Sequence, residues 1–187
     1  MRWWKVIIGV MGAIGVIGMG WYVTRPVPGT RMDDQGREHV SPQAVSEFNY
    51  NSNPPTSGQH DPDWVRPGVY TEPQNKGKLI HSLEHGYIVV HYSCTTNPKS
   101  QIPMTNTVAT GSAVVDTQAC NTLIKQLEDV VREKKLKKLI LVPQPDLDKT
   151  IALSAWTYLD TFDTFDAGRI GRFIDYHRDQ GPEKTME

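Results

Sequence analysis

The chain has 187 residues, of which 38% are hydrophobic and 22% charged, and this size and composition suit one compact domain with an appendage. Its formal net charge of -1 provides no basic surface that would neutralise a run of phosphates. We therefore expect no nucleic-acid partner, and the length excludes a large multi-domain enzyme.

The first part of the sequence, residues 1–24, predicts a transmembrane anchor. No charged residue lies between Lys5 and Arg25, and a helix over this apolar run would cross a hydrocarbon core of about 30 Å. Aromatic residues at both ends of the run suit the two membrane interfaces. A cleaved signal peptide would have a shorter apolar region and a small-x-small cleavage site, and the sequence has no convincing one.

Basic residues on either side of the apolar run set its expected orientation. Arg2 and Lys5 precede the run, whereas Arg25 and Arg31 follow it. Together with the amino terminus, the first pair favours a cytoplasmic N-terminus and an exported C-terminal domain. We therefore expect a single-pass protein of the plasma (inner) membrane, in contact with lipid through its N-terminal helix and with an extracytoplasmic, periplasmic domain.

An extended linker is predicted over residues 25–44, which are rich in proline, glycine and mixed charges. The exported domain then occupies residues 45–187 and starts with the irregular arm NYNSNPPTSGQHDPDWVRPGVY. Its four prolines exclude helix and central strand alike. A loop this long in a compact domain is usually functional or disordered. Because its aromatics and its Pro-Pro pair argue for order, we expect His60 to be held in place.

The stretch HSLEHGYIVVHY contains three of the six histidines. In a strand, His81 and His85 would lie about 13 Å apart, whereas in a helix they would stack at roughly 6 Å and chelate one ion. Gly86 is a typical helix stop. We therefore predict one helical turn over residues 80–85.

The residues after this turn, YIVVHY, are mostly β-branched or aromatic and predict a strand. His91 lies inside this strand, where a packed or half-exposed structural histidine is the simplest interpretation. After the strand, Cys94 and Cys120 flank a polar loop, and in an oxidising exported compartment they are expected to form a disulfide. Two thiolates joined by Met104 in a copper site are the alternative.

The rest of the chain predicts a small sheet with helices. A helical stripe of apolar residues starts near Thr117, and the strand KLILVP follows it. KTIALSAWTYLD reads as a second strand-like run, and FDAGRIGRFIDYHRD as a helix with His177 on its apolar face. This order predicts an α+β fold, in which two helices cover a small mixed sheet preceded by a long proline-rich arm.

Six short motifs occur in a fixed order along the exported part. They are HV at His39, NSNPPTSGQH ending at His60, GVY near Tyr70, HSLEHG from His81, IALSAW from Ile151 and GPE from Gly181. In this order they resemble the domain-of-unknown-function family 3105. The resemblance implies a membrane-anchored single domain without an assigned biochemical role, and its motifs contain the histidines and the glutamate that the chemistry singles out.

Three classes of function follow from these residues. In the first, His60, His81 and His85 hold copper or zinc, completed by His39 or Glu84, for delivery to or assembly of another membrane or exported protein. The second is a metal-dependent hydrolase with Glu84 as its base, since His-x-x-Glu-His is also an inverted zinc-protease signature. The third is a non-enzymatic interaction module whose histidines are held by hydrogen bonds. Because inverted zinc proteases carry the His-x-x-Glu-His motif within a long helix of a much larger chain, we expect binding in preference to catalysis.

Overall fold

The computed structural model describes residues 3–4, 7–8, 11, 26–94 and 117–185. Most of the predicted anchor, and the loop between the two cysteines with Met104, lie outside these residues. Within the described ranges, no helix is both long enough and apolar enough to cross a membrane.

A six-stranded mixed sheet lies at the centre of the fold, with the strand order β1-β6-β5-β3-β4-β2. β3 pairs in parallel with β4 and antiparallel with β5. The strands are β1 Thr30–Arg31, β2 Gly68–Val69, β3 Ile88–Tyr92, β4 Leu139–Pro143, β5 Ile151–Ala155 and β6 Tyr158–Phe162. The described helices are α2 Pro42–Glu47, α3 Lys76–Glu84, α4 Thr117–Glu133 and α5 Ala167–His177. The predicted α+β class is confirmed.

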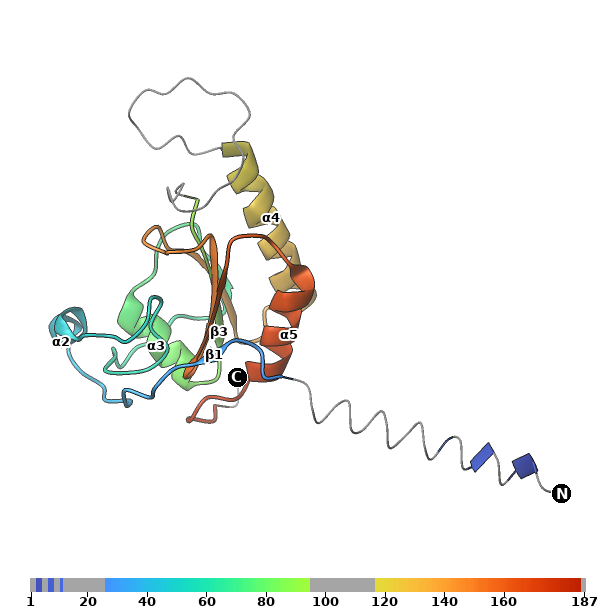
Figure 1. Ribbon diagram of the computed structural model, residues 1–187. Helices are drawn as coiled ribbons and strands as arrows, with labels where there is room; N and C mark the ends of the chain where they lie inside the picture. The colour runs from blue at the N-terminus through green and yellow to red at the C-terminus, as the bar shows by residue number, and fades with distance from the viewer. Residues whose placement is uncertain (1–2, 5–6, 9–10, 12–25, 95–116, 186–187) are drawn as a thin grey trace.

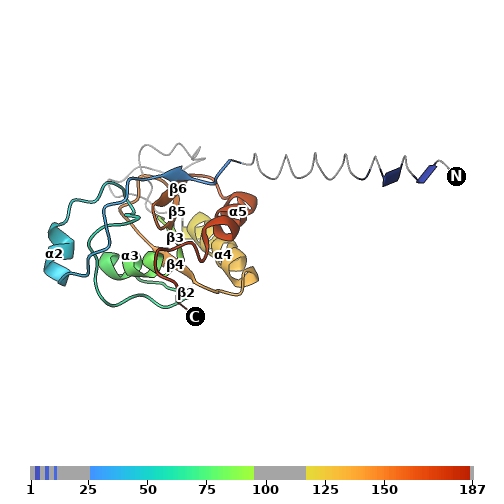
Figure 2. The same ribbon diagram turned by 90° about the horizontal axis from the view of Figure 1, so that it is seen from below.

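Helices cover both faces of the sheet. Successive residues of the central strand β3 point to opposite sides, and all five are buried, so each face needs a covering layer. Ile88 and Val90 pack in one hydrophobic cluster with α4 and α5, and Val89 packs in a second cluster with Leu79 and Leu83 of α3. Figures 1 and 2 show α3 on one side of the sheet and α4 with α5 on the other. The prediction that two helices cover the sheet is therefore wrong in number, since the single helical turn expected near His81 is a helix of nine residues.

The predicted strand-like run KTIALSAWTYLD is in fact a hairpin. β5 and β6 pair antiparallel, and Ala155 lies opposite Tyr158 across the two-residue turn Trp156 and Thr157. Thr157 adopts a φ of 58°, a conformation that is uncommon outside Gly, Asn and Asp. Since such turns usually contain Asn-Gly or a similar pair, the sequence carries no signal that would divide the run.

Residues of the predicted linker pack along the domain. β1 pairs antiparallel with β6 at the edge of the sheet. Further on, the backbone N–H of His60 donates to Glu38 O at 3.0 Å, and Val40 N–H donates to His60 O at 2.9 Å. This short parallel bridge between His39 and His60 brings together two segments that the sequence places in the linker and in the proline-rich arm.

The C-terminal segment crosses the end of α3 at very close range. Asp179 N–H donates to Gly86 O at 2.9 Å, and Glu183 N–H donates to Glu84 O at 3.0 Å. A Cβ at Gly181 would overlap the carbonyl oxygen of Glu84, and Gly86 has a φ of +80°. The motifs HSLEHG and GPE therefore meet in space, and each has glycine where the two backbones touch.

This crossing predicts that Gly181→Ala lowers the free energy of unfolding by about 1–3 kcal/mol, because the new methyl group would force the two backbones apart. Urea unfolding of the full chain in a mild detergent measures the change. Gly171→Ala in α5 is the matched control, since its Cβ would meet no atom closer than 3.9 Å. That control is expected to add about 0.5–1 kcal/mol through helix propensity. Equal stabilities for the two variants would contradict the close crossing.

The predicted disulfide between Cys94 and Cys120 is confirmed, with a sequence separation of 26 residues. Because neither cysteine is free, the alternative of a copper–thiolate site is wrong. In the chain-entropy description, closing a loop of this length stabilises the fold by about 3.5 kcal/mol. We expect the double variant Cys94→Ala/Cys120→Ala to unfold at correspondingly lower urea concentration. A reducing agent should shift the wild-type midpoint and leave that of the variant unchanged; two equal shifts would contradict this account.

A candidate metal-binding site

Helix α3 and its C-cap residue, His85, carry three of the candidate residues on one side. His81 lies three residues before Glu84 and four before His85, which is the spacing of side chains on a common helix face. The opposite face holds Leu79 and Leu83, which pack toward the sheet. All three candidate side chains are buried, so this face of α3 is covered by other parts of the chain.

Local interactions fix both ends of α3. The Asn75 side chain accepts a hydrogen bond from Lys78 N–H at 3.1 Å and caps the N-terminus. At the C-terminus, Gly86 N–H donates to Leu83 O and Tyr87 N–H donates to Ser82 O. With the left-handed Gly86, this is a Schellman motif. The predicted glycine stop is thus confirmed, and it directs the chain from the site straight into β3.

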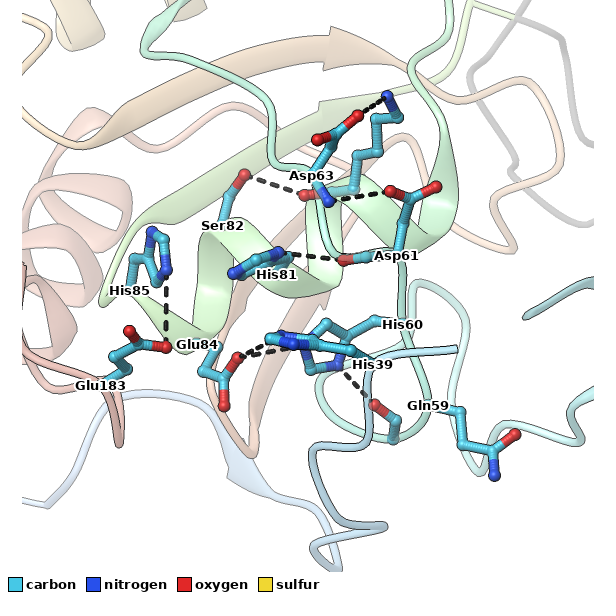
Figure 3. Close-up of polar contacts among 12 residues, drawn as sticks. His39, Gln59, His60, Asp61, Asp63, His81, Ser82, Glu84, His85 and Glu183 are labelled. Atoms are coloured by element: carbon cyan, nitrogen blue, oxygen red, sulfur yellow. Dashed lines mark hydrogen bonds and ion pairs between the residues drawn. The ribbon is translucent and has the colours of Figure 1, made fainter. Parts of the chain in front are cut away.

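The linker and the proline-rich arm cover the histidine face of α3. Their parallel bridge places the ring centroid of His39 at 4.7 Å and that of His60 at 5.2 Å from the ring of His81. Figure 3 shows the rings of His39 and His60 directed at the Glu84 carboxylate, with His81 beside them. One ligand atom from each of His39, His60, His81 and Glu84 lies within 4.8 Å of all the others. We call these four residues the inner site.

The predicted ligand His85 does not belong to the inner site. It forms a second group with His81 and Glu183, whose ligand atoms also lie within 4.8 Å of one another. Sequence reasoning missed Glu183, although the GPE motif contains it. The signal lay in the glycines of GPE and HSLEHG, because close backbone contact between these motifs carries Glu183 to His85.

Backbone carbonyls fix the protonated nitrogen of two inner-site histidines. His60 Nδ1 lies 2.8 Å from Gly58 O, and His81 Nδ1 lies 2.9 Å from Asp61 O. A carbonyl oxygen only accepts, so each Nδ1 must carry a hydrogen and donate it. When the rings are neutral, both Nε2 atoms hold a free lone pair. Metal-binding histidines are typically oriented by this kind of second hydrogen bond.

The contact between His60 and Glu84 brings two acceptors face to face. His60 Nε2 lies 3.0 Å from Glu84 Oε2, while its Nδ1–H is already donated to Gly58. His60 is fully buried and Glu84 nearly so. A neutral imidazole beside an ionised carboxylate is unfavourable here, because burial strengthens the repulsion between the two lone pairs. The pair is satisfied by an additional proton or by a cation that both atoms bind.

The distances in the inner site suit a shared cation. Two donor atoms bound tetrahedrally to one zinc ion at about 2.0–2.1 Å lie about 3.4 Å apart. Glu84 Oε2 lies 3.0 Å from His60 Nε2 and 3.5 Å from His39 Nε2. Small side-chain movements would therefore bring these atoms to an ion between them.

Burial keeps His81 in the form that binds metal. Desolvation lowers the pKa of His81, and the nearby charge of a protonated His85 lowers it further, while the hydrogen bond to Asp61 O acts in the opposite direction. Only the neutral imidazole offers a lone pair. The lowered pKa of His81 therefore favours the neutral, metal-binding form.

One inner-site ligand is open to solvent. The side chain of His39 is 45% exposed, compared with 4% for Glu84. It borders an open depression on the protein surface, which Asp61, Asp63 and Lys78 also line. The inner site therefore has a buried base formed by His60, His81 and Glu84 and a solvent-accessible fourth ligand.

The other two histidines lie outside both groups. His91 is buried in β3, as predicted, with its Nε2 at 2.9 Å from Ser154 Oγ. His177 lies on the buried face of α5, also as predicted, and its Nε2 donates to Pro28 O at 2.8 Å. These two residues support the fold, and variants of them can be compared with variants of the four clustered histidines.

Comparison with known proteins finds one family. The model of the family described as "Protein of unknown function (DUF3105)" matches residues 39–115 and 111–187. These segments include all the clustered histidines, Glu84 and Glu183. Neither the curated proteins nor the solved structures contain a match to the chain.

The burial of His91 predicts a pH dependence of stability. Desolvation lowers the pKa of His91 to about 3, whereas the residue titrates near 6.5 in the unfolded chain. As the pH falls, the unfolded chain gains a proton at this residue and the folded chain does not, so stability is lost. From about pH 7.5 to about pH 5 this loss is about 2 kcal/mol. Urea unfolding at several pH values measures it.

The control for this effect is His91→Gln, which cannot titrate. Its free energy of unfolding should fall less steeply over the same pH range, and the other histidines contribute equally to both proteins. The same slope in the variant and the wild type would contradict the burial argument.

Proposed function

The chain belongs to the DUF3105 family, and we propose that it is a membrane-anchored, extracytoplasmic protein whose inner site binds a divalent transition-metal ion. The observation that carries this proposal is the contact between His60 and Glu84. His60 Nε2 has no hydrogen to donate when the ring is neutral, yet it lies 3.0 Å from a carboxylate oxygen. A metal ion bound by both atoms removes this conflict without adding a proton to a buried pair.

The ligand types favour zinc or divalent copper. Three imidazole nitrogens and one carboxylate oxygen are common ligands of zinc, and imidazole also suits copper. Monovalent copper prefers sulfur ligands, and both cysteines are already joined in the disulfide. The inner site therefore matches a borderline divalent ion better than a soft one.

The position of Glu84 favours binding over hydrolysis. A catalytic zinc site usually has three protein ligands and keeps a position for water, which a separate base activates. Here Glu84 itself lies among the ligand atoms, within 3.5 Å of two histidine nitrogens. Binding to the ion would occupy the carboxylate that the hydrolase alternative requires as its base.

The setting of the domain supports a role in metal delivery or metalloprotein assembly. A disulfide is typical of an oxidising, extracytoplasmic compartment, and the apolar run over residues 1–24 provides the proposed lipid anchor. The exposed His39 is a ligand that an incoming protein can replace. A partner of this kind would be another membrane or exported protein that receives the ion.

We expect the full chain, purified in a mild detergent and treated with a chelator, to rebind one zinc ion per molecule. His60→Ala and His81→Ala should each weaken binding by about 100-fold or more, because each removes a lone pair oriented by a backbone carbonyl. Competition with a chromophoric chelator measures the affinity, and metal analysis measures the stoichiometry.

The matched control is His177→Gln, because the glutamine amide can still donate to Pro28 O and the residue lies outside the site. This variant should bind zinc as the wild type does. Circular dichroism verifies that each variant is folded. The proposal would be refuted if the wild-type protein bound neither zinc nor copper and His60→Ala only lowered the stability of the fold. That result would favour a hydrogen-bonded interaction module.

A further inference from the structure

A second set of ligands adjoins the inner site on the side of the C-terminal segment. His85 Nε2 and Glu183 Oε2 lie 3.6 Å apart, which is longer than a hydrogen bond and close to the separation of about 3.4 Å for two ligands of one zinc ion. Figure 3 shows this pair on one side of His81, with His39 and His60 on the other. We call His81, His85 and Glu183 the outer position.

The outer position shares its central ligand with the inner site. His81 Nδ1 is committed to Asp61 O, so the neutral ring has one free nitrogen. Within each group the ligand atoms lie within 4.8 Å of one another, and His81 belongs to both groups. Its single lone pair binds one ion at a time, and two divalent ions on either side of one imidazole would also repel each other. The two groups are therefore alternative positions for one ion.

Two ligands of the outer position, His85 and Glu183, are held less firmly than His60 and His81 of the inner site. His85 is buried, but its Nδ1 has no hydrogen-bond partner among the described residues. It therefore lacks the carbonyl contact that fixes His60 and His81. Glu183 has a side chain that is 49% exposed. Ligands without this support bind more weakly, so the outer position suits transient occupation.

The C-terminal segment makes the outer position accessible. The backbone of Glu183 is fixed through its N–H bond to Glu84 O at 3.0 Å, while its carboxylate reaches solvent. An ion that first binds this exposed carboxylate next meets His85, which is 5% exposed, and then His81, which is 4% exposed. The ring centroids of these two histidines lie 4.5 Å apart, so each step replaces one ligand by a neighbour.

We propose that the outer position is a transfer site, through which a divalent metal ion enters and leaves the inner site by exchanging ligands at His81. This inference rests on the proposed function, since it requires that the inner site binds metal. In this proposal His85 and Glu183 set the rates at which the metal ion is loaded and released, while the inner site sets the affinity for the ion.

The test compares rates and equilibrium affinities with cobalt(II) as a spectroscopic probe. His85→Phe keeps an aromatic ring against Trp64, and Glu183→Gln keeps the backbone contact to Glu84. Stopped-flow absorbance follows loading of the full chain in a mild detergent and release of the ion to excess chelator. We expect either variant to slow both steps by about tenfold, while the dissociation constant changes by less than about threefold.

Glu133→Gln is the control, because this exposed carboxylate lies at the end of α4, outside both groups. It should load and release cobalt as the wild type does. Wild-type rates in His85→Phe and Glu183→Gln, with stoichiometric binding intact, would overturn the transfer site and leave the proposed function standing.

Two further results would also overturn the transfer site while the inner site remains. One is a loss of stoichiometric binding in these variants, which would make His85 and Glu183 resident ligands. The other is two ions per wild-type chain, which would show that both positions fill together. A wild-type chain that binds no cobalt and no zinc would instead refute the proposed function, and this inference with it.

Discussion

The His60 ring is held between two acceptors, and the rest of the site is arranged around this constraint. Gly58 O fixes the hydrogen on Nδ1, and the Glu84 carboxylate lies opposite Nε2. The contact forms only because the proline-rich arm runs along α3 and the linker runs along the arm. Backbone hydrogen bonds tie the linker to the arm. These segments hold a polar cluster that an apolar core would exclude unless its members were satisfied.

A close backbone crossing extends the cluster toward solvent. Gly86 ends α3, and Gly181 lets the C-terminal segment approach the last turn of that helix. The same crossing explains why two motifs far apart in the sequence belong to one structural unit. It also sets a gradient of exposure, from the fully buried His60 to the half-exposed Glu183. For a metal ion, this gradient separates a firmly held position from one that exchanges with the surroundings.

Sequence patterns predicted the parts of the site that depend on local geometry. The spacing of His81 and His85 and the following glycine predicted a helix end, and the predicted export of the domain favoured a disulfide between the cysteines. His39 was a predicted candidate ligand, but its contact with His60 was not predictable, because the bridge consists of backbone hydrogen bonds with no periodic apolar signal. Glu183 was not predicted as a ligand for a similar reason, since its position depends on a tertiary contact between glycines. The hairpin turn at Trp156 and Thr157 lacks the usual turn residues and was read as continuous strand.

A site with four protein ligands, three of them buried, raises a kinetic difficulty for a protein that passes its ion to another. Firm binding by oriented histidines implies slow release, because every ligand must be lost before the ion departs. Stepwise substitution reduces this difficulty, as each bond is replaced while the others hold. His81 suits such a sequence because it belongs to both groups of ligands, while its Nδ1 is held by Asp61 O. His85 and Glu183 are held by fewer hydrogen bonds than His60 and His81, and this suits an exchange position. Such a position must release the ion more readily than the inner site does.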